Sequence, residues 1–231
     1  MKRFYREAAA LPIAAGFGVA LDGRLVKTPA KRDLVLPAAA LATAIVAEWN
    51  AQEAEIRAAA MPLTRLAGLT IDRDPPQRAA LVRQTTDYAD SDLVCYRAPG
   101  QPALAARQET VWQPLIDWAA LRYRAPLRVT AGVIPLPQPA ASLGAFAAVV
   151  GKYDDFALTA LFTATAACGS LIIALALCEG RLDAAEALTA SQLDESFQNE
   201  AWGEDAEAAA RRAALAADIE SAARFLSLSR A

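Results

Sequence analysis

The first forty residues carry the alternating pattern of short β-strands. Large apolar side chains alternate with smaller residues over 17–21, as far as the dipeptide Asp22-Gly23, which accepts the positive backbone angles of a two-residue hairpin turn. We expect the chain to return over residues 25–28 and to form a further short strand over 34–36. This pattern predicts a small antiparallel β region at the N-terminus.

The apolar spacing changes beyond residue 37. Leu41, Ile45 and Trp49 recur every four residues, which makes one apolar stripe along a helix and places Trp49 in the core. From Met61 onward the pattern is almost exclusively helical, and Pro114 should kink one of these helices or begin a new one. We therefore predict an α+β fold, with a β-rich domain containing one helix over residues 1–60 and a larger all-helical domain over residues 61–231.

One uncharged run raises the possibility of a membrane protein. Residues 156–178 contain no charged side chain, and about twenty apolar residues suffice to cross a bilayer. The run is rich in Ala and Thr, is broken at Gly169-Ser170, and lacks a basic flank and an aromatic belt. We expect a buried helix or helical hairpin and no membrane insertion, while a membrane-associated adaptor built on this run is one alternative.

The absence of histidine excludes much catalytic chemistry. With none in 231 residues, histidine-dependent nucleophiles, imidazole acid-base catalysis and histidine-ligated metals are unavailable. Carboxylate chemistry survives that argument, so an enzyme using a pair such as Asp87 and Asp92 is a second alternative. Together with Asp90 these residues lack the ligand spacing of a calcium loop, and we interpret them as a solvated helix end. We expect no catalytic residue and no metal site.

Other ligand classes also lack their signatures. The formal net charge of -3 comes from intermixed acidic and basic residues, which argues against a nucleic-acid partner. Gly16-Phe17-Gly18 lacks the third glycine and the following helix of a dinucleotide loop, so no nucleotide or other cofactor is expected. Cys168-Gly169-Ser170 is not a nucleophile elbow. The odd number of cysteines suits a reducing compartment, and no targeting segment is evident.

A polar helix face provides the candidate binding site. Asp183 followed by Glu186 has the form of a capping box, which predicts a helix from Asp183 to Gly203. An aromatic side chain beside an acidic helix face is the composition of a recognition patch, although charged helix faces are usually only solvated. The candidate partner-binding residues are Gln192, Glu195, Gln198, Asn199, Glu200 and Trp202.

Short blocks in a fixed order carry a family resemblance. They are 16–24, 27–31, Glu48-Trp49, 61–67, 71–73, 92–97, 112–118, 169–171, 193–195, Phe197-Gln198 and Trp202-Gly203. Together they cover nearly the whole chain and resemble the assembly chaperone family for the catalytic head of ATP synthase. At Thr70-Ile71 the chain departs from the pattern, where an alanine commonly stands.

The resemblance implies a non-enzymatic function and a partner. Members of the family bind the isolated alpha subunit of F-type ATP synthase before it pairs with the beta subunit, and their fold joins a small β domain to a helical domain. The resemblance also implies that the acidic end of the 193–202 block matters for activity, which favours Glu195 and its neighbours as functional residues. Eukaryotic relatives act in the mitochondrial matrix, whereas this chain looks bacterial, so the cytoplasm is implied.

The implied mechanism requires no nucleotide. An unpaired alpha subunit would expose the apolar surface that normally faces beta, and exposed patches of that kind favour aggregation. A chaperone would cover this surface through a contact of modest size and would then give way to the larger interface with beta.

Overall fold

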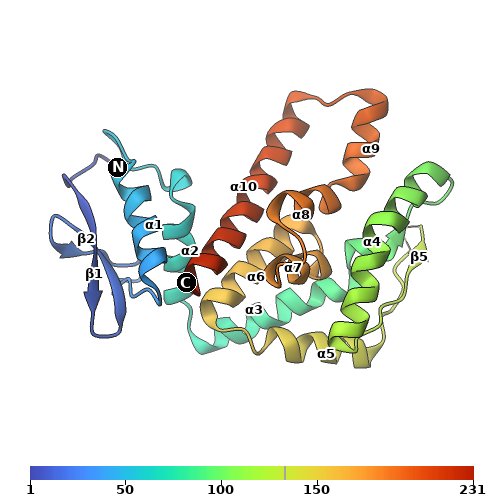
Figure 1. The fold of residues 1–231 in the computed structure, drawn as a ribbon, viewed down its shortest axis with the longest axis horizontal. Coiled ribbons are helices and arrows are strands. Elements are labelled where there is room, and N and C mark those ends of the chain that lie inside the picture. The colour runs from blue at the N-terminus through green and yellow to red at the C-terminus, as the bar shows by residue number, and fades with distance from the viewer. Residues whose placement is uncertain (133) are drawn as a thin grey trace. The chain divides into compact units, whose positions relative to one another are not determined.

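The computed structural model describes residues 1–132 and 134–231. The chain forms two compact units: Met1–Arg78, Asp154–Ala160 and Arg224–Ala231 make up the first, and Ala79–Tyr153 and Leu161–Ala223 the second. Figure 1 shows a small antiparallel sheet near the N-terminus followed by helices, which confirms the predicted α+β class. The division into domains over 1–60 and 61–231 stays a prediction.

The first unit contains the sheet. Strand β1 (Ala8–Ile13) pairs with β2 (Gly16–Leu21), which pairs with the short β3 (Arg24–Leu25), all antiparallel. Asp22 and Gly23 have positive φ angles of 47° and 81°, which confirms the predicted hairpin turn. The returning strand is shorter than expected, and residues 34–36 form no regular strand. They join β2 through an isolated bridge, in which Phe17 and Leu36 exchange two backbone hydrogen bonds of 2.9 and 2.8 Å.

Helix α1 (Ala39–Asn50) packs on β1 and β2 (Figure 1). Leu41 and Ile45 are fully buried and Trp49 is 9% exposed, so the predicted apolar stripe is confirmed. The same helix closes part of the outer edge of the sheet, since the Asn50 amide accepts from the Ala8 N–H and donates to the Ala8 carbonyl at 2.9 and 3.1 Å. Pro12 on the same strand has no N–H to offer, so little of this edge can pair with another chain.

Helix α2 (Pro62–Ile71) is held at both ends by residues from elsewhere in the first unit. The Glu48 carboxylate accepts from the N–H groups of Leu63 and Thr64 at 2.7 and 2.8 Å, which satisfies free donors at the helix start. Beyond the other end, Asp72 accepts from the Thr28 hydroxyl and the Ala30 N–H. The remaining element of this region is the 3-10 turn η1 (Ala58–Ala60).

The second unit is helical apart from one small parallel pairing. Its elements, three of which also contribute to the first unit, are α3 (Pro75–Asp87), η2 (Tyr88–Ser91), η3 (Leu93–Cys95), β4 (Tyr96–Arg97), α4 (Pro102–Tyr123), β5 (Thr130–Ala131), α5 (Ala140–Val150), α6 (Asp155–Cys168), α7 (Leu171–Cys178), α8 (Ala184–Ser191), α9 (Leu193–Trp202) and α10 (Ala206–Ser229). Strand β4 pairs with β5. Helix α4 continues through Pro114, so this proline does not begin a new helix.

The uncharged run of residues 156–178 forms α6 and α7, joined at Gly169 and Ser170. Gly169 has a positive φ of 64°, and the Ser170 hydroxyl accepts from the Ile173 N–H at 3.0 Å to cap α7. All residues of α7 except Cys178 are buried, which confirms the expected burial of this part of the run. Across the described ranges, no helix is long and apolar enough to cross a bilayer.

Candidate partner-binding surface

The predicted single helix from Asp183 to Gly203 is wrong. The capping box at Asp183 and Glu186 is present, but α8 ends at Ser191 and α9 starts after Gln192, whose backbone angles are φ -107° and ψ 26°. The break accompanies a contact with α4: Leu193 is buried, and the Asp194 carboxylate accepts from the Gln108 amide of α4 at 2.8 Å. Packing against α4 therefore competes successfully with a continuous helix.

All six candidate residues lie on α9 or at its start. Glu195, Gln198, Glu200 and Trp202 are exposed, whereas Gln192 and Asn199 are half-buried. Trp202 is 80% exposed, which is unusual for so large an apolar side chain. Most of these side chains can thus reach a partner, and the binding role itself stays a prediction.

Glu200 is engaged within the chain, which the sequence did not suggest. Arg107 of α4 donates two hydrogen bonds to its carboxylate, at 2.6 and 2.7 Å, and the guanidinium lies 5.1 Å from the centre of the Phe197 ring. These hydrogen bonds lower the pKa of Glu200 and raise the pKa of Arg107. In contrast, no hydrogen bond or ion pair involves the Glu195 side chain in the part of the chain that the structure describes. Glu195 is therefore the more available carboxylate.

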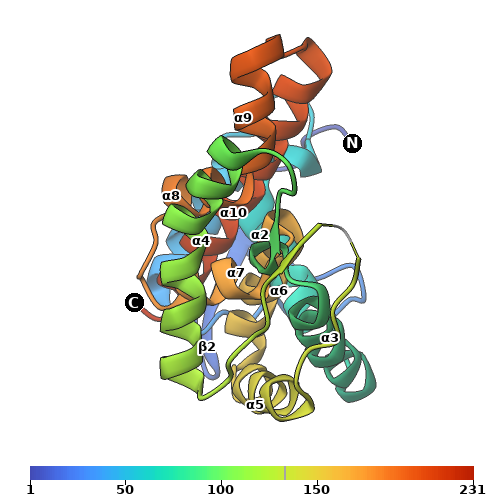
Figure 2. The ribbon, with the colours of Figure 1, turned by 90° about the vertical axis from the view of Figure 1, so that its right-hand side faces the viewer.

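Two adjoining hollows run along α4, with α8 and α9 opposite. The first has a volume of about 410 Å³ and the second about 340 Å³, and both are lined by Val111 and Thr189. We call the pair the α4 groove. Its remaining lining residues are Ala106, Arg107, Thr110, Leu193, Ser196 and Glu200 in the first hollow, and Leu115, Leu182, Asp183, Ala185, Glu186 and Ala190 in the second. Figure 2 shows α4 in front with α8 and α9 beside it.

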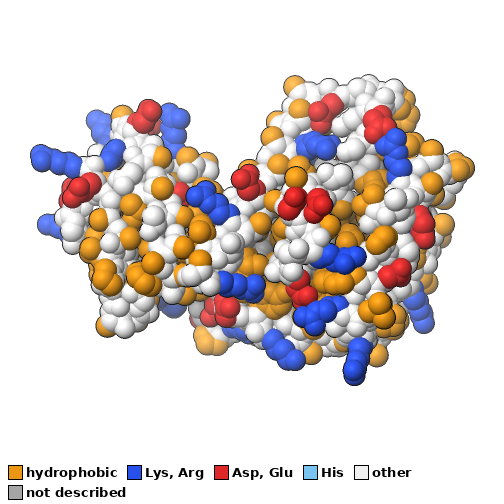
Figure 3. Space-filling model, in the orientation of Figure 1, with side chains coloured by type: hydrophobic (Ala, Val, Ile, Leu, Met, Phe, Trp, Pro, Cys, Tyr) orange, Lys and Arg blue, Asp and Glu red, His pale blue; other side chains and the backbone are white. Residues whose placement is uncertain are grey.

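The α4 groove is apolar along its middle and charged at both ends. Its middle is lined by alanine, valine and leucine side chains together with the hydroxyl groups of threonine and serine. Asp183 and Glu186 lie at one end, and the Arg107–Glu200 ion pair lies at the other. The segment from Leu182 to Ala210 contains eight acidic residues and no Lys or Arg. Figure 3 shows acidic and basic side chains next to one another around α9, with hydrophobic atoms between the charged groups.

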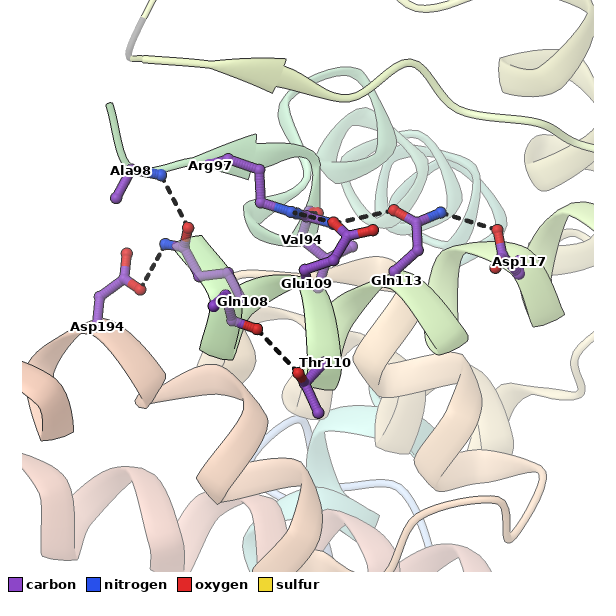
Figure 4. Close-up of polar contacts among 10 residues, drawn as sticks. Val94, Arg97, Ala98, Gln108, Glu109, Thr110, Gln113, Asp117 and Asp194 are labelled. Atoms are coloured by element: carbon purple, nitrogen blue, oxygen red, sulfur yellow. Dashed lines mark hydrogen bonds and ion pairs between the residues drawn. The ribbon is translucent and has the colours of Figure 1, made fainter. Parts of the chain in front are cut away.

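A polar network fixes the position of α4 (Figure 4). Gln108 accepts from the Ala98 N–H and donates to Asp194, both at 2.8 Å, so one amide joins α4 to the segment after β4 and to α9. The buried Arg97 of β4 contacts Glu109 at 3.4 Å and, one turn further along α4, Gln113 at 3.2 Å. One wall of the groove is therefore rigidly held.

Asp92 corrects the interpretation of residues 87–92 as a solvated helix end. Its side chain is fully buried and accepts from the N–H groups of Val94 and Ile172 at 3.3 and 3.1 Å, as well as from the Ser170 hydroxyl. Burial raises its pKa to about 6, although these hydrogen bonds oppose the shift. Asp87 and Asp90 are exposed. Asp92 thus joins η3 to the start of α7. These hydrogen bonds give the buried carboxylate a structural role.

Other groups considered as possible chemical sites have structural roles. Burial raises the pKa of the Cys95 and Cys168 thiols to about 12, so both stay protonated and act as small apolar groups. A Cβ atom on Gly16 would collide with the Leu36 carbonyl oxygen. The close approach of these two backbone segments therefore explains why glycine stands at position 16. Among the described residues, no group of His, Cys, Asp or Glu side chains could hold a metal ion.

Most blocks of the family resemblance hold the fold together. Glu48 accepts from N–H groups at the start of α2, and Asp72 joins the end of α2 to residues 28–30. Trp112 donates its indole N–H to the Ala190 carbonyl at 2.8 Å. The end of the 193–202 block is largely exposed and borders the α4 groove. Arg107 and the α4 wall could not be predicted from the sequence pattern, because the partners of α9 come from a helix some ninety residues earlier.

Comparisons with known proteins agree with this resemblance. The family described as ATP12 chaperone protein matches residues 2–120. The crystal structure of Atp12 from Paracoccus denitrificans is 44% identical, with a TM-score of 0.93 over 99% of this chain and 98% of that one. An Asp-to-Lys mutant of the same protein has the same values. A candidate chaperone from Agrobacterium tumefaciens is 40% identical, with a TM-score of 0.93 over 98% of this chain and 85% of that one. The chain therefore belongs to the ATP12 chaperone family.

Proposed function

We propose that this chain is an assembly chaperone for the catalytic head of F-type ATP synthase. In this proposal it binds the unpaired alpha subunit, covers the apolar surface that would otherwise face beta, and releases alpha when beta binds. The observation that carries the proposal is the family membership, at 44% identity over nearly the full length of Atp12 from Paracoccus denitrificans. The bacterial sources of the similar structures support a role in the bacterial cytoplasm.

The surface of the second unit supports a reversible protein contact. The α4 groove offers apolar side chains between charged ends, and Trp202 is an exposed aromatic of the kind that anchors interfaces. A partly polar contact of modest size can give way to a larger competing interface, so release requires no nucleotide hydrolysis. We propose no catalytic role and no cofactor for this surface.

The test uses purified alpha subunit of a bacterial ATP synthase, kept without beta. We expect a one-to-one complex, measured by size-exclusion chromatography with light scattering, and suppression of the light scattering that accompanies alpha aggregation. Addition of beta should transfer alpha out of the complex. Equal protection of unrelated aggregating proteins would contradict the proposed specificity, and a complex that resists excess beta would contradict the proposed release.

A further inference from the structure

We propose that the α4 groove binds an amphipathic helix of the unpaired alpha subunit. Apolar side chains of that helix would enter the groove, and a Lys or Arg side chain would meet Asp183 and Glu186. This inference rests on the function proposed above and adds the surface of contact and the chemistry of the occupant.

The length of the groove matches a short helix. Its lining residues on α4 extend from Ala106 to Leu115, and a rise of 1.5 Å per residue makes this about 14 Å. Apolar side chains at positions i, i+4 and i+7 of a bound helix span about 11 Å, which is the usual pattern of anchors in a helix-binding groove. The two hollows would therefore receive successive anchors, one on each side of Val111 and Thr189.

The walls favour a helix over an extended segment. An added strand needs a free sheet edge for its backbone hydrogen bonds, whereas the groove is lined by residues of the helices α4, α8 and α9 and of the segment before α8. A helix satisfies its own backbone groups and presents only side chains. It can pack its side-chain ridges against the neighbouring helices in the way that helices pack within proteins.

The charge of the groove selects a basic occupant. One arginine and three carboxylates line it, which gives a net charge of -2. Arg107 is already neutralised by Glu200. Among the described residues Asp183 and Glu186 form no ion pair, so the net negative charge of the groove lies at these two carboxylates. Both are exposed, and the capping box uses one oxygen of each carboxylate. An acidic helix would meet like charges there, which suppresses wrong partners.

The test blocks the groove at its centre. Thr189 is exposed and lines both hollows, and its hydroxyl donates to the Ala185 carbonyl of its own helix, so Thr189→Trp can fill the groove without removing core packing. Ala106→Trp does the same from the α4 wall. We expect each variant to weaken alpha capture by at least about tenfold. Ala213→Trp, on the exposed side of α10, is the matched control and is expected to bind within about twofold of the wild type.

A second arm tests the charge. Glu186→Gln keeps a side-chain acceptor for the capping box and removes the negative charge. We expect it to slow association of alpha at low salt by about threefold and to reduce the salt dependence of the association rate. An unchanged rate and salt dependence would overturn the charge selection.

The outcomes separate this inference from the function on which it rests. Failure of the wild type to capture alpha would overturn the proposed function. Capture by the wild type that both tryptophan variants retain would overturn the groove as the binding site and leave the proposed function intact. A photo-crosslinking residue at position 189 identifies the bound segment of alpha, and a product at a β-strand or an acidic segment would also contradict the inference.

Discussion

Trp49 provides the sharpest test of how the first unit is held together. Its side chain is 9% exposed, its ring lies 5.5 Å from that of Tyr5 in an edge-to-face arrangement, and its carbonyl accepts from the Tyr5 hydroxyl at 2.7 Å. Trp49→Ala removes the indole and this ring pair but keeps the carbonyl acceptor. Buried tryptophan truncations cost about 3 to 5 kcal/mol, so we expect the melting temperature to fall by about 6 to 20 °C for a chain of this length.

The replacement Trp49→Phe should behave differently, because the indole N–H of Trp49 is buried and has no hydrogen-bond partner among the described residues. Leaving a buried donor unpaired costs about 1 to 3 kcal/mol. Phenylalanine removes that donor and keeps an aromatic ring against Tyr5, at the expense of burial equivalent to one or two methylene groups, about 0.8 to 1.6 kcal/mol. The two changes nearly cancel, so we expect Trp49→Phe to alter stability by less than about 1 kcal/mol.

Urea unfolding of the wild type and both variants, followed by circular dichroism, measures these differences. An unchanged stability in Trp49→Ala would place the side chain outside the core and refute the packing argument. A loss in Trp49→Phe as large as that in Trp49→Ala would refute the argument from the unpaired donor, since it would mean that the indole N–H is stabilised in the folded protein.

Three further predictions concern charge, pH and the sheet edge. Glu195→Lys should leave thermal stability within about 0.5 kcal/mol of the wild type and weaken alpha capture, whereas unchanged capture would remove α9 from the interface. For Asp92, a folded pKa of about 6 above an ordinary 3.8 means that its contribution to stability is full below about pH 4 and is lost as the pH rises through 6. The unfolding free energy of the wild type relative to Asp92→Asn should therefore fall by about 3 kcal/mol over that interval, and a pH-independent difference would contradict the buried carboxylate. Asn50→Ala should raise concentration-dependent association by exposing the β1 edge, measured by light scattering, and no increase would show that Pro12 alone protects it.

Local patterns predicted the elements that depend on near neighbours. The hairpin at Asp22-Gly23, the stripe of α1 and the burial of residues 156–178 all follow from spacing and turn chemistry within a few residues. The strand over 34–36 was predicted from apolar content alone. The structure joins it to β2 through only one residue pair, Phe17 and Leu36, and the number of pairs that form depends on how the two segments meet in space.

The errors concern residues whose partners are distant in sequence. Three aspartates within six residues indicate a solvated surface, yet Asp92 is buried because the start of α7, 80 residues later, supplies backbone donors to it. In the same way, nothing within 183–203 predicts a break at Gln192. The break follows from the contact of Leu193 and Asp194 with α4, and tertiary packing of this kind overrides helix propensity.

The same limitation changes the reason for preferring Glu195 over Glu200 as a binding residue. In the sequence the two differ only in their place along the helix. Among the described residues, Glu200 is bound to Arg107, whereas Glu195 forms no side-chain hydrogen bond or ion pair. A charge reversal at Glu200 would place a lysine against Arg107 and disturb the contact between α9 and α4, so a loss of alpha capture could follow without any direct contact with alpha. Reversal at Glu195 leaves that contact intact. A loss of capture in Glu195→Lys together with normal melting would therefore report on binding. The same loss in Glu200→Lys could come from lost binding or from a shift of α9, and comparison with Arg107→Ala, which breaks the same ion pair, would distinguish the two.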